Sequence, residues 1–255
     1  LPASKIGIPV IHVESGLRSY DNKMPEEINR LVVDRLSDLL LTHSRQADEN
    51  LRREGISDTK IIFVGNTMID TLRRMLPQAR IQDLSRLGLP VGPYGLVTLH
   101  RPSNVDEARR LKSIADALVE TAKRVPLVFP VHPRTRAKLS DLELKLPGVQ
   151  LLDPQGYTSF IALQQRAAFV VTDSGGVQEE ATWLNIPCLT LRPNTERPVT
   201  ISDGTNTLIG EDPHEILPHV CAILEGRYKE ARVPEGWDGA AAERAADAII
   251  KMFGA

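Results

Sequence analysis

The stretch "TDSGGVQEEA", residues 172–181, places a serine and two glycines between an apolar run and an amphipathic run. Glycine-rich turns that open a helix bind phosphates, because unpaired backbone N–H groups and the positive end of the helix dipole point toward them. Ser174, Gly175 and Gly176 can offer such donors, and Glu180 lies one turn further on, within reach of a ribose hydroxyl. The stretch is neither a Walker loop nor a GxGxxG fingerprint, so it gives little support to ATP or NAD. The alternative interpretation is a plain tight turn capped by its own polar residues.

Further polar side chains follow other apolar runs, where the strands of a parallel sheet are expected to end. They are His12, Glu14 and Arg18 in "HVESGLR", Glu26 and Glu27 in "MPEEINR", His100 and Arg101 in "TLHRPSN", and Glu196 and Arg197 in "RPNTERP". Glu14 is the hardest to explain structurally, since a carboxylate that finishes an apolar strand costs free energy unless something pairs with it or uses it. Carboxylates, an imidazole and a phosphate-type turn at strand ends together favour a catalytic site.

Several of these side chains also have a purely structural interpretation. His12 is flanked by apolar residues and can be a hydrogen-bonded histidine of the core. Glu26 and Glu27 suit the positive end of their helix, and Glu27 with Arg30 can form a surface ion pair that contributes little. The sequence alone leaves these alternatives open.

The elements that must position these groups alternate along the chain. Short runs rich in Val, Ile and Leu predict strands at 8–14, 39–43, 60–66, 94–100, 127–132, 149–154, 168–173 and 186–192. Helix signals lie between them, namely Pro25 at a first helical position, Ser44 before "RQADENLRRE", Asn104 three residues before Glu107, and a final amphipathic "AAERAADAIIKMF". This alternation predicts a doubly wound α/β fold with parallel sheets. Pro and Gly cluster at 76–93, where we expect an interdomain linker.

Composition bounds the class of protein. The chain of 255 residues is 42% hydrophobic, with 31 basic against 33 acidic residues, which argues against partners recognised by bulk charge, such as nucleic acid or an anionic membrane. Cys188 and Cys221 are far apart and flanked by apolar residues, which favours buried thiols over a disulfide or a metal site. No stretch approaches the roughly 20 apolar residues of a membrane span, and we expect a cytoplasmic protein.

Five linked motifs carry a family resemblance that runs from about residue 8 to the C-terminal helix. In order and spacing, "HVESGLRS", "PEEINR", "VTLHRPSN", "DPQGYTSF" and "TDSGGVQEEA" with the later "TERP" resemble the non-hydrolysing UDP-N-acetylglucosamine 2-epimerases. The resemblance implies the GT-B architecture of two Rossmann-like, doubly wound domains. It also implies interconversion of UDP-N-acetylglucosamine and UDP-N-acetylmannosamine without NAD or metal, by elimination of UDP to a 2-acetamidoglucal and re-addition.

The same resemblance implies roles for individual residues. Glu14 and Glu26 become the acid/base candidates, and His100 lies by the diphosphate. The implied contacts to the UDP-sugar are Ser174, Gly175 and Gly176 to the phosphates, Glu180 to the ribose, Gln155 and Phe160 to the uracil, and Arg197 near the sugar diphosphate. His12, Arg18 and Arg101 are weaker candidates.

By this resemblance, residues 1–80 form the second half of an N-terminal domain, 81–238 a complete nucleotide-binding domain, and 239–255 a helix that packs back toward the N-terminal domain. Leu1 then falls inside a helix, and the family's first βα units, with a catalytic aspartate and a basic segment, have no counterpart here. We therefore expect a partner segment that completes the N-terminal domain, or a fragment. A homodimer is the family expectation.

Two alternative functions stand beside the epimerase. One is a neighbouring GT-B chemistry, either a hydrolysing epimerase that releases free N-acetylmannosamine or a glycosyltransferase, although "PEEINR" with "LHRPSN" favours the non-hydrolysing branch. The other is a chain that binds a UDP-sugar and turns over nothing by itself. The sequence leaves open whether the sugar carries one acetamido group or two, as in a diacetamido uronate, and whether the substrate is also an allosteric activator.

Overall fold

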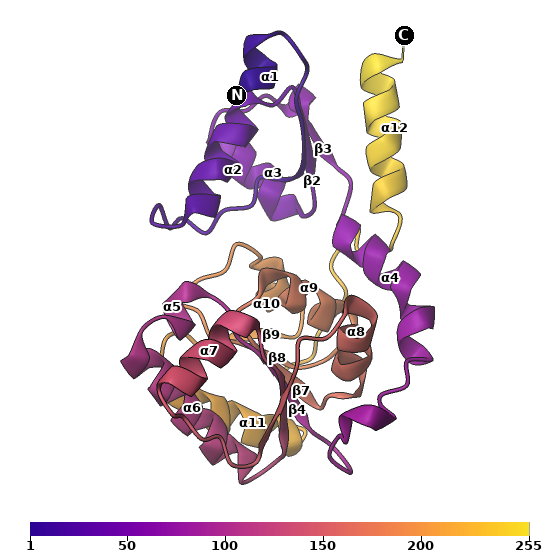
Figure 1. Cartoon of the computed structure of the whole chain (residues 1–255). Coiled ribbons are helices and arrows are strands. Elements are labelled where there is room, and N and C mark those ends of the chain that lie inside the picture. The colour runs from indigo at the N-terminus through magenta and orange to yellow at the C-terminus, as the bar shows by residue number, and fades with distance from the viewer. Residues whose placement is uncertain (255) are drawn as a thin grey trace. The chain divides into compact units, whose positions relative to one another are not determined.

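The computed structural model describes residues 1–254 as an α/β protein built on parallel sheets (Figure 1). These residues form two compact units. Unit 1 contains Leu1–Arg74, Thr195–Ser202 and the chain from Val233 on, and unit 2 contains Met75–Asn194 and Asp203–Arg232. The predicted α/β class with parallel strands is confirmed. The domain limits expected at residues 80 and 238 stay a prediction.

Unit 1 is organised around a parallel sheet in the order β1–β2–β3. Its strands are β1 (Ile11–Ser15), β2 (Leu39–Thr42) and β3 (Ile61–Phe63). Its helical elements are α1 (Pro2–Lys5), α2 (Pro25–Leu36), α3 (Arg45–Arg53), the 3₁₀ turn η1 (Asp58–Lys60), most of α4 (Thr67–Arg80), α10 (Val199–Ser202) and α12 (Ala241–Phe253). Ala245 and Ala248 of α12 share a core with Leu39 and Leu41 of β2 and with Val64. A helix late in the chain thus packs against the earliest strands.

Unit 2 holds a larger parallel sheet in the order β6–β5–β4–β7–β8–β9. The strands are β4 (Gly95–Thr98), β5 (Leu127–Pro130), β6 (Val149–Leu152), β7 (Phe169–Thr172), β8 (Cys188–Thr190) and β9 (Asn206–Leu208). The chain first adds strands on one side of β4 and then returns to add β7, β8 and β9 on the other side. This doubly wound order creates a switch point between β4 and β7, and such folds bind ligands at the carboxyl ends of the strands there.

Helices connect and cover the strands of unit 2. They are η2 (Ser85–Leu87), α5 (Pro102–Val105), α6 (Ala108–Ala122), α7 (Pro133–Asp141), α8 (Tyr157–Arg166), α9 (Gly175–Trp183), η3 (Pro213–Glu215) and α11 (Ile216–Leu224). The core packs Ile114 and Leu118 of α6 against strand residues such as Phe129 and Phe169. Since β5 and β7 are buried along their whole length, their apolar runs match strands that are covered on both faces.

Each strand predicted from the sequence is found within residues 1–254, although the observed strands are shorter at one or both ends. Strand β9 was missed, because "NTL" is too short and too polar to give a periodic signal. The helix starts at Pro25 and after Ser44 are confirmed, and the Ser44 hydroxyl accepts a hydrogen bond from the Ala47 amide at 3.3 Å. Within residues 1–254, no helix combines the length and apolar character that crossing a membrane requires.

Two expectations about local structure are wrong. Asn104 does not cap the helix that follows it, because it lies inside α5 and its side-chain amide donates to the Asp173 carboxylate. The segment at 76–93 is not simply a linker, since α4 continues through Pro77 to Arg80 and η2 follows. Proline near a helix end masked the helical pattern in the sequence.

A close approach of two backbone segments in unit 1 gives a first prediction. Gly65 has φ +89°, and a Cβ added there would lie 2.0 Å from the Gly236 carbonyl oxygen, whereas Gly55, with φ +77°, has open space around it. Gly55→Ala therefore carries only the left-handed backbone penalty, about 1 to 2 kcal/mol of unfolding free energy. Gly65→Ala adds a steric clash, and we expect a total of at least about 3 kcal/mol. Urea unfolding of both variants measures the difference, and equal losses would contradict the close approach.

Candidate active site

The site in unit 2 begins at the switch point of the sheet. Strands β4 and β7 lie side by side in parallel, with Thr98 opposite Thr172 at their carboxyl ends. The segment with His100 follows β4, and the segment with Ser174 follows β7. The topology therefore brings together two of the polar clusters that the sequence singled out, at the edge where doubly wound sheets bind ligands.

Asp173, directly after β7, connects these two segments. Its side chain is fully buried and accepts hydrogen bonds from the backbone N–H of His100 at 3.1 Å and of Arg101 at 2.9 Å, and from the Asn104 amide at 3.1 Å. Burial raises the pKa of this carboxyl. The His100 side chain, 3.2 Å away, and the other hydrogen-bond donors lower the pKa by more than burial raises it, so the net shift is downward. Asp173 is therefore an ionised anchor that holds the His100 segment in place.

The glycine turn opens α9, as the sequence predicts. Helix α9 begins at Gly175, with Ser174 at the N-cap position and its N–H bonded to the Thr172 hydroxyl at 3.0 Å. Within residues 1–254, no side chain caps this helix start. Because the first N–H groups of a helix have no partner inside the helix, they remain available to an anion. The cap by Asp173 or Ser174 expected in the alternative interpretation is not found, while the phosphate-binding role of the turn stays a prediction.

Glu180 lies one turn into α9 and is buried, with 3% of its surface exposed. The Tyr157 hydroxyl, from the first residue of α8, donates to its Oε1 at 2.9 Å. Burial raises the pKa of Glu180 to about 7, and the hydrogen bond from Tyr157 opposes this rise. Gln155 and Phe160, the residues expected to contact a uracil ring, lie just before and within the same helix and are half-buried. Unit 2 therefore gathers the predicted diphosphate, ribose and uracil contacts on neighbouring elements.

Unit 1 carries the other candidates, beginning with Glu14. This residue has φ +63° and lies where the pairing of β1 with β2 is interrupted, between Val13 and Ser15. A left-handed conformation is uncommon outside glycine and clusters at functional sites. Glu14 is partly buried and accepts a hydrogen bond from the Thr67 hydroxyl at 3.4 Å, whereas Glu26, at the start of α2, is exposed. The catalytic roles of these two carboxylates stay a prediction.

His12 and Arg18 are both tied to Asp34, a buried residue of α2. The Nδ1 of His12 lies 2.5 Å from Asp34 Oδ1, and Arg18 Nη1 lies 2.7 Å from Oδ2. Arg18 also binds Glu54 through Nε at 2.6 Å, and its side chain is 1% exposed. Burial disfavours the charge of Arg18, but the hydrogen bonds to Glu54 and Asp34 outweigh this effect and raise its pKa. These contacts support the structural interpretation of His12 and give Arg18 a structural role as well; both were weaker candidates for substrate contact.

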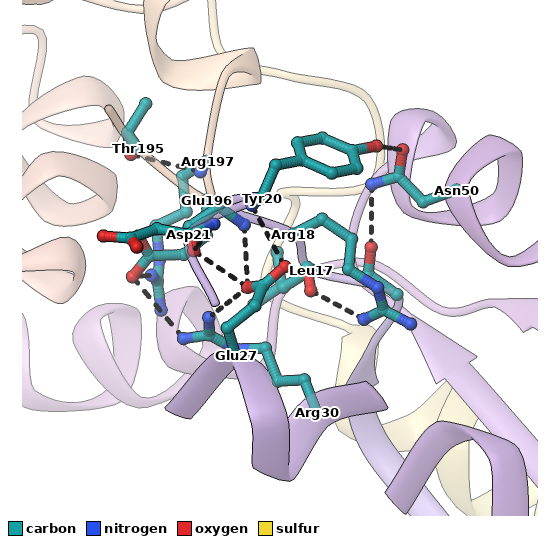
Figure 2. Close-up of polar contacts among 12 residues, drawn as sticks. Leu17, Arg18, Tyr20, Asp21, Glu27, Arg30, Asn50, Thr195, Glu196 and Arg197 are labelled. Atoms are coloured by element: carbon teal, nitrogen blue, oxygen red, sulfur yellow. Dashed lines mark hydrogen bonds and ion pairs between the residues drawn. The ribbon is translucent and has the colours of Figure 1, made fainter. Parts of the chain in front are cut away.

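The expectation that Glu27 forms a surface ion pair with Arg30 is wrong, because Glu27 is buried. It is 1% exposed, and it accepts hydrogen bonds from the backbone N–H of Ser19 at 2.8 Å and of Tyr20 at 3.0 Å, and from the Ser19 hydroxyl at 2.9 Å (Figure 2). Arg30 binds the same carboxylate at 3.2 Å. Glu27 therefore fixes the segment between β1, which carries Glu14, and α2, which carries Glu26.

Arg30 extends this network to the "TERP" segment of unit 1. Its second guanidinium nitrogen lies 3.6 Å from Glu196 Oε1, and Arg197 Nη1 binds the same oxygen at 2.6 Å (Figure 2). Charges alternate along Glu27, Arg30, Glu196 and Arg197, so each side chain is held by its neighbours. The predicted sugar-diphosphate contact at Arg197 is thus 9% exposed and fixed in position.

Sequence reasoning missed Asp173, Tyr157 and Asp34 as residues that shape the site. Asp173 carried the same signal that drew attention to Glu14, a carboxylate at the end of an apolar strand. Tyr157 stood inside the motif "DPQGYTSF" without a role of its own. Asp34 sits inside an amphipathic helix, where a charged residue gives no signal.

The sheet order, the open start of α9 and the buried carboxylates around it define the class of doubly wound α/β proteins with a ligand site at the switch point. A family model described as UDP-N-acetylglucosamine 2-epimerase matches residues 1–250. The chain therefore belongs to the UDP-N-acetylglucosamine 2-epimerase family, and the resemblance that its motifs carry is confirmed.

Two curated relatives illustrate the match. The chain is 41% identical over 236 residues to a UDP-N-acetylglucosamine 2-epimerase of Methanococcus maripaludis, covering 88% of this chain and 64% of the relative. It is 44% identical over 214 residues to a UDP-2,3-diacetamido-2,3-dideoxy-D-glucuronate 2-epimerase of Pseudomonas aeruginosa, covering 82% and 59%. The chain thus spans less than two thirds of the length of these two relatives.

Solved structures agree with the fold. The crystal structure of a UDP-GlcNAc 2-epimerase of Methanocaldococcus jannaschii, in complex with UDP-GlcNAc and UDP, has a TM-score of 0.86 and 39% identity, covering 96% of this chain and 71% of that one. The enzyme of Neisseria meningitidis, bound to UDP-GlcNAc, has a TM-score of 0.87 and 32% identity, with 98% and 71% covered. The predicted GT-B fold class is thereby confirmed.

The buried position of Glu27 generates the second prediction. In Glu27→Gln, an amide NH₂ replaces one carboxylate oxygen and faces N–H donors, so the backbone amides of Ser19 and Tyr20 lose acceptor strength. We expect hydrogen exchange at these two amides to accelerate by about tenfold or more, read by mass spectrometry of peptides covering 17–21. Glu26→Gln is the matched control, since it makes the same change on an exposed neighbour. Equal exchange in both variants would contradict the anchoring role of Glu27.

Proposed function

We propose that this chain is a non-hydrolysing UDP-N-acetylglucosamine 2-epimerase that interconverts UDP-N-acetylglucosamine and UDP-N-acetylmannosamine. The observation that carries the proposal is the pairing, at the switch point of unit 2, of the open start of α9 with the buried Glu180 carboxylate one turn away. A diphosphate next to a ribose needs this combination of N–H donors and a carboxylate acceptor. The names of the relatives support the same substrate class.

The proposed binding mode follows from the chemistry of each group. Backbone donors at Ser174, Gly175 and Gly176 bind the diphosphate together with His100, whose segment Asp173 anchors. Glu180 accepts hydrogen bonds from the ribose. Gln155 and Phe160 contact the uracil, Arg197 binds near the sugar diphosphate, and Arg101 is a weaker candidate for a contact to the ligand.

The proposed reaction is an elimination followed by re-addition. A carboxylate takes the proton from sugar carbon 2, the electron pair of that C–H bond forms the C1=C2 double bond, and the C1–O bond breaks with its electrons going to UDP. The hydrogen at carbon 2 is weakly acidic, so donors around the diphosphate must stabilise the charge that develops on the leaving oxygen. UDP then re-adds to carbon 1 while a proton reaches carbon 2 from the other face, and no water is consumed.

Inversion at carbon 2 needs proton transfer on both faces of the sugar, and therefore more than one acid/base group. Glu14 and Glu26 of unit 1 are the proposed groups. Both lie beside the segment that Glu27 anchors, which supports a fixed placement for each of them. The strained backbone at Glu14 supports a functional rather than a structural reason for a carboxylate at that position.

The relative from Pseudomonas aeruginosa favours a second candidate substrate. Its name describes the same inversion at carbon 2 on a UDP-diacetamido uronate. The elimination chemistry is unchanged, because the extra acetamido and carboxylate groups lie on other carbons. Both sugar nucleotides therefore belong in the first assay.

Proton NMR of each sugar nucleotide in D2O, with the chain and without added NAD or metal, tests the proposal. Loss of the carbon 2 proton signal, with the epimeric sugar nucleotide appearing, is the expected result. Release of a free sugar identifies a hydrolysing enzyme instead. A persistent carbon 2 signal with UDP still bound identifies a binding protein that does not turn over by itself.

Glu14→Gln supplies the third prediction. The amide cannot take the proton from carbon 2, so deuterium exchange falls by about two to four orders of magnitude while UDP affinity stays within about threefold. Glu49→Gln, an exposed carboxylate of α3 in the same unit, is the control and keeps the original exchange rate. Exchange at the original rate in Glu14→Gln would remove Glu14 from the mechanism.

Gly176→Leu supplies the fourth prediction. A branched side chain in the first turn of α9 obstructs an anion that approaches the backbone N–H groups, so UDP affinity falls by about tenfold or more. Uridine, which has no phosphate, serves as the matched ligand and keeps its affinity. If both ligands weaken equally, or neither weakens, the diphosphate does not bind at this turn.

A further inference from the structure

Glu180 is held from one side by two hydrogen-bond donors of α8. The Tyr157 hydroxyl donates to Oε1 at 2.9 Å. With its amide oriented to match its surroundings, Gln164 donates to Oε2 at 3.3 Å and accepts from the Ala181 N–H at 3.1 Å. Gln164 is fully buried, whereas Tyr157 is 39% exposed at the first turn of its helix. Among the residues that the structure describes, each carboxylate oxygen thus has one protein donor.

This arrangement leaves the Glu180 carboxylate able to accept further hydrogen bonds. An ionised carboxylate has about four acceptor positions, two on each oxygen. With one position on each oxygen already taken, one remains on each, which matches the two adjacent hydroxyls of a ribose. A protonated carboxyl group could not accept on both oxygens in the same way, because one of them would carry the proton.

Two opposing effects act on the charge state of Glu180. Burial raises its pKa to about 7, and the Tyr157 hydrogen bond acts in the opposite direction. Tyr157 is the titratable group that bonds to Glu180 from α8. Strands β7, β8 and β9 pack against α9, and the titratable residue among them is Cys188 of β8, which stays neutral because burial raises its pKa to about 12. Among residues 1–254, no other charged side chain is resolved as shifting the Glu180 pKa. Asp173 and His100 bond to each other at the other end of the turn.

We propose that Tyr157 is a positioning residue, which holds Glu180 as a carboxylate that accepts from both hydroxyls of the nucleotide ribose. The proposal rests on the nucleotide binding described under Proposed function. It adds a residue that controls how strongly Glu180 binds the ribose hydroxyls. Tyr157 acts through Glu180, and it does not need to contact the sugar or the reacting atoms.

The test measures the affinity for UDP-N-acetylglucosamine from pH 5.5 to 9 by calorimetry. The two phosphates of this ligand are both esterified and do not titrate in this range, and loss of the uracil N3 proton at its upper end is the same for all four proteins. The proteins are the unchanged chain, Tyr157→Phe, Glu180→Gln and Tyr94→Phe. Tyr94 is the matched control, because its buried hydroxyl donates to the Leu163 carbonyl of α8 at 2.6 Å and does not touch Glu180.

For the unchanged chain we expect affinity to fall as the pH drops below about 7, because the Glu180 proton must leave before ribose binds. In Tyr157→Phe the lost donor raises the midpoint by about one pH unit. At pH 7 this variant then binds about fivefold more weakly, and at pH 9 the two proteins differ by only about 10%. Glu180→Gln removes this pH dependence, and Tyr94→Phe keeps the original midpoint.

Several results overturn the proposal. An unchanged midpoint in Tyr157→Phe, or a shift no larger than in Tyr94→Phe, shows that Tyr157 does not control the carboxylate. Tighter binding by Tyr157→Phe at every pH shows that its hydroxyl competes with the ribose. If the unchanged chain does not bind the ligand at all, the proposed function fails, and the inference is then tested without ligand. In that case carbon-13 NMR follows the pH titration of the Glu180 carboxyl signal, which is assigned because it is missing in Glu180→Gln. If the titration midpoint is the same in the unchanged chain and in Tyr157→Phe, the inference is refuted.

Discussion

Buried carboxylates that accept backbone N–H groups hold the segments after the strands in both units. In unit 2, Asp173 fixes the backbone of His100 and Arg101. In unit 1, Glu27 fixes Ser19 and Tyr20 in the same way. A loop cannot bury its own backbone donors without partners, and an ionised acceptor satisfies several at once with hydrogen bonds stronger than neutral ones. His100 and Arg101 sit on one of these segments, and Glu14 and Glu26 flank the other.

The tandem glutamates of "PEEINR" show how such an anchor can be hidden in a sequence. Glu26 and Glu27 are chemically identical neighbours at the start of α2. Glu26 is exposed, whereas Glu27 is buried, with 1% of its surface exposed. Successive helix positions point about 100° apart, so only one of them faces the segment from Ser19 to Tyr20. The exposed carboxylate of Glu26 faces solvent, while the buried carboxylate of Glu27 binds backbone N–H groups. The different surroundings of two adjacent residues follow from helix geometry.

The sequence predicted the general fold because parallel strands covered on both sides leave uninterrupted apolar runs, as in β5 and β7. It also predicted the helix starts at Pro25 and Ser44, where local chemistry decides the outcome. Asn104 was misassigned because a distant carboxylate, Asp173, takes its side chain. Tyr157 and Asp34 were overlooked for the same reason, since their roles depend on partners 23 and 22 residues away. Pairwise contacts of this range leave no local pattern.

The make-up of unit 1 also bears on how the chain is assembled during synthesis. Its early strands share a core with Ala245 and Ala248 of α12, whereas the β-strands of unit 2 all lie between residues 95 and 208. Domains fold as units while the chain emerges from the ribosome, N-terminal segments first. In this chain the order is inverted. The sheet of unit 1 is synthesised first, but its core is completed only when α12 has been synthesised. By then the strands of unit 2 are already complete. Until α12 has been synthesised, the apolar side chains of β2 that it covers lack this part of their core.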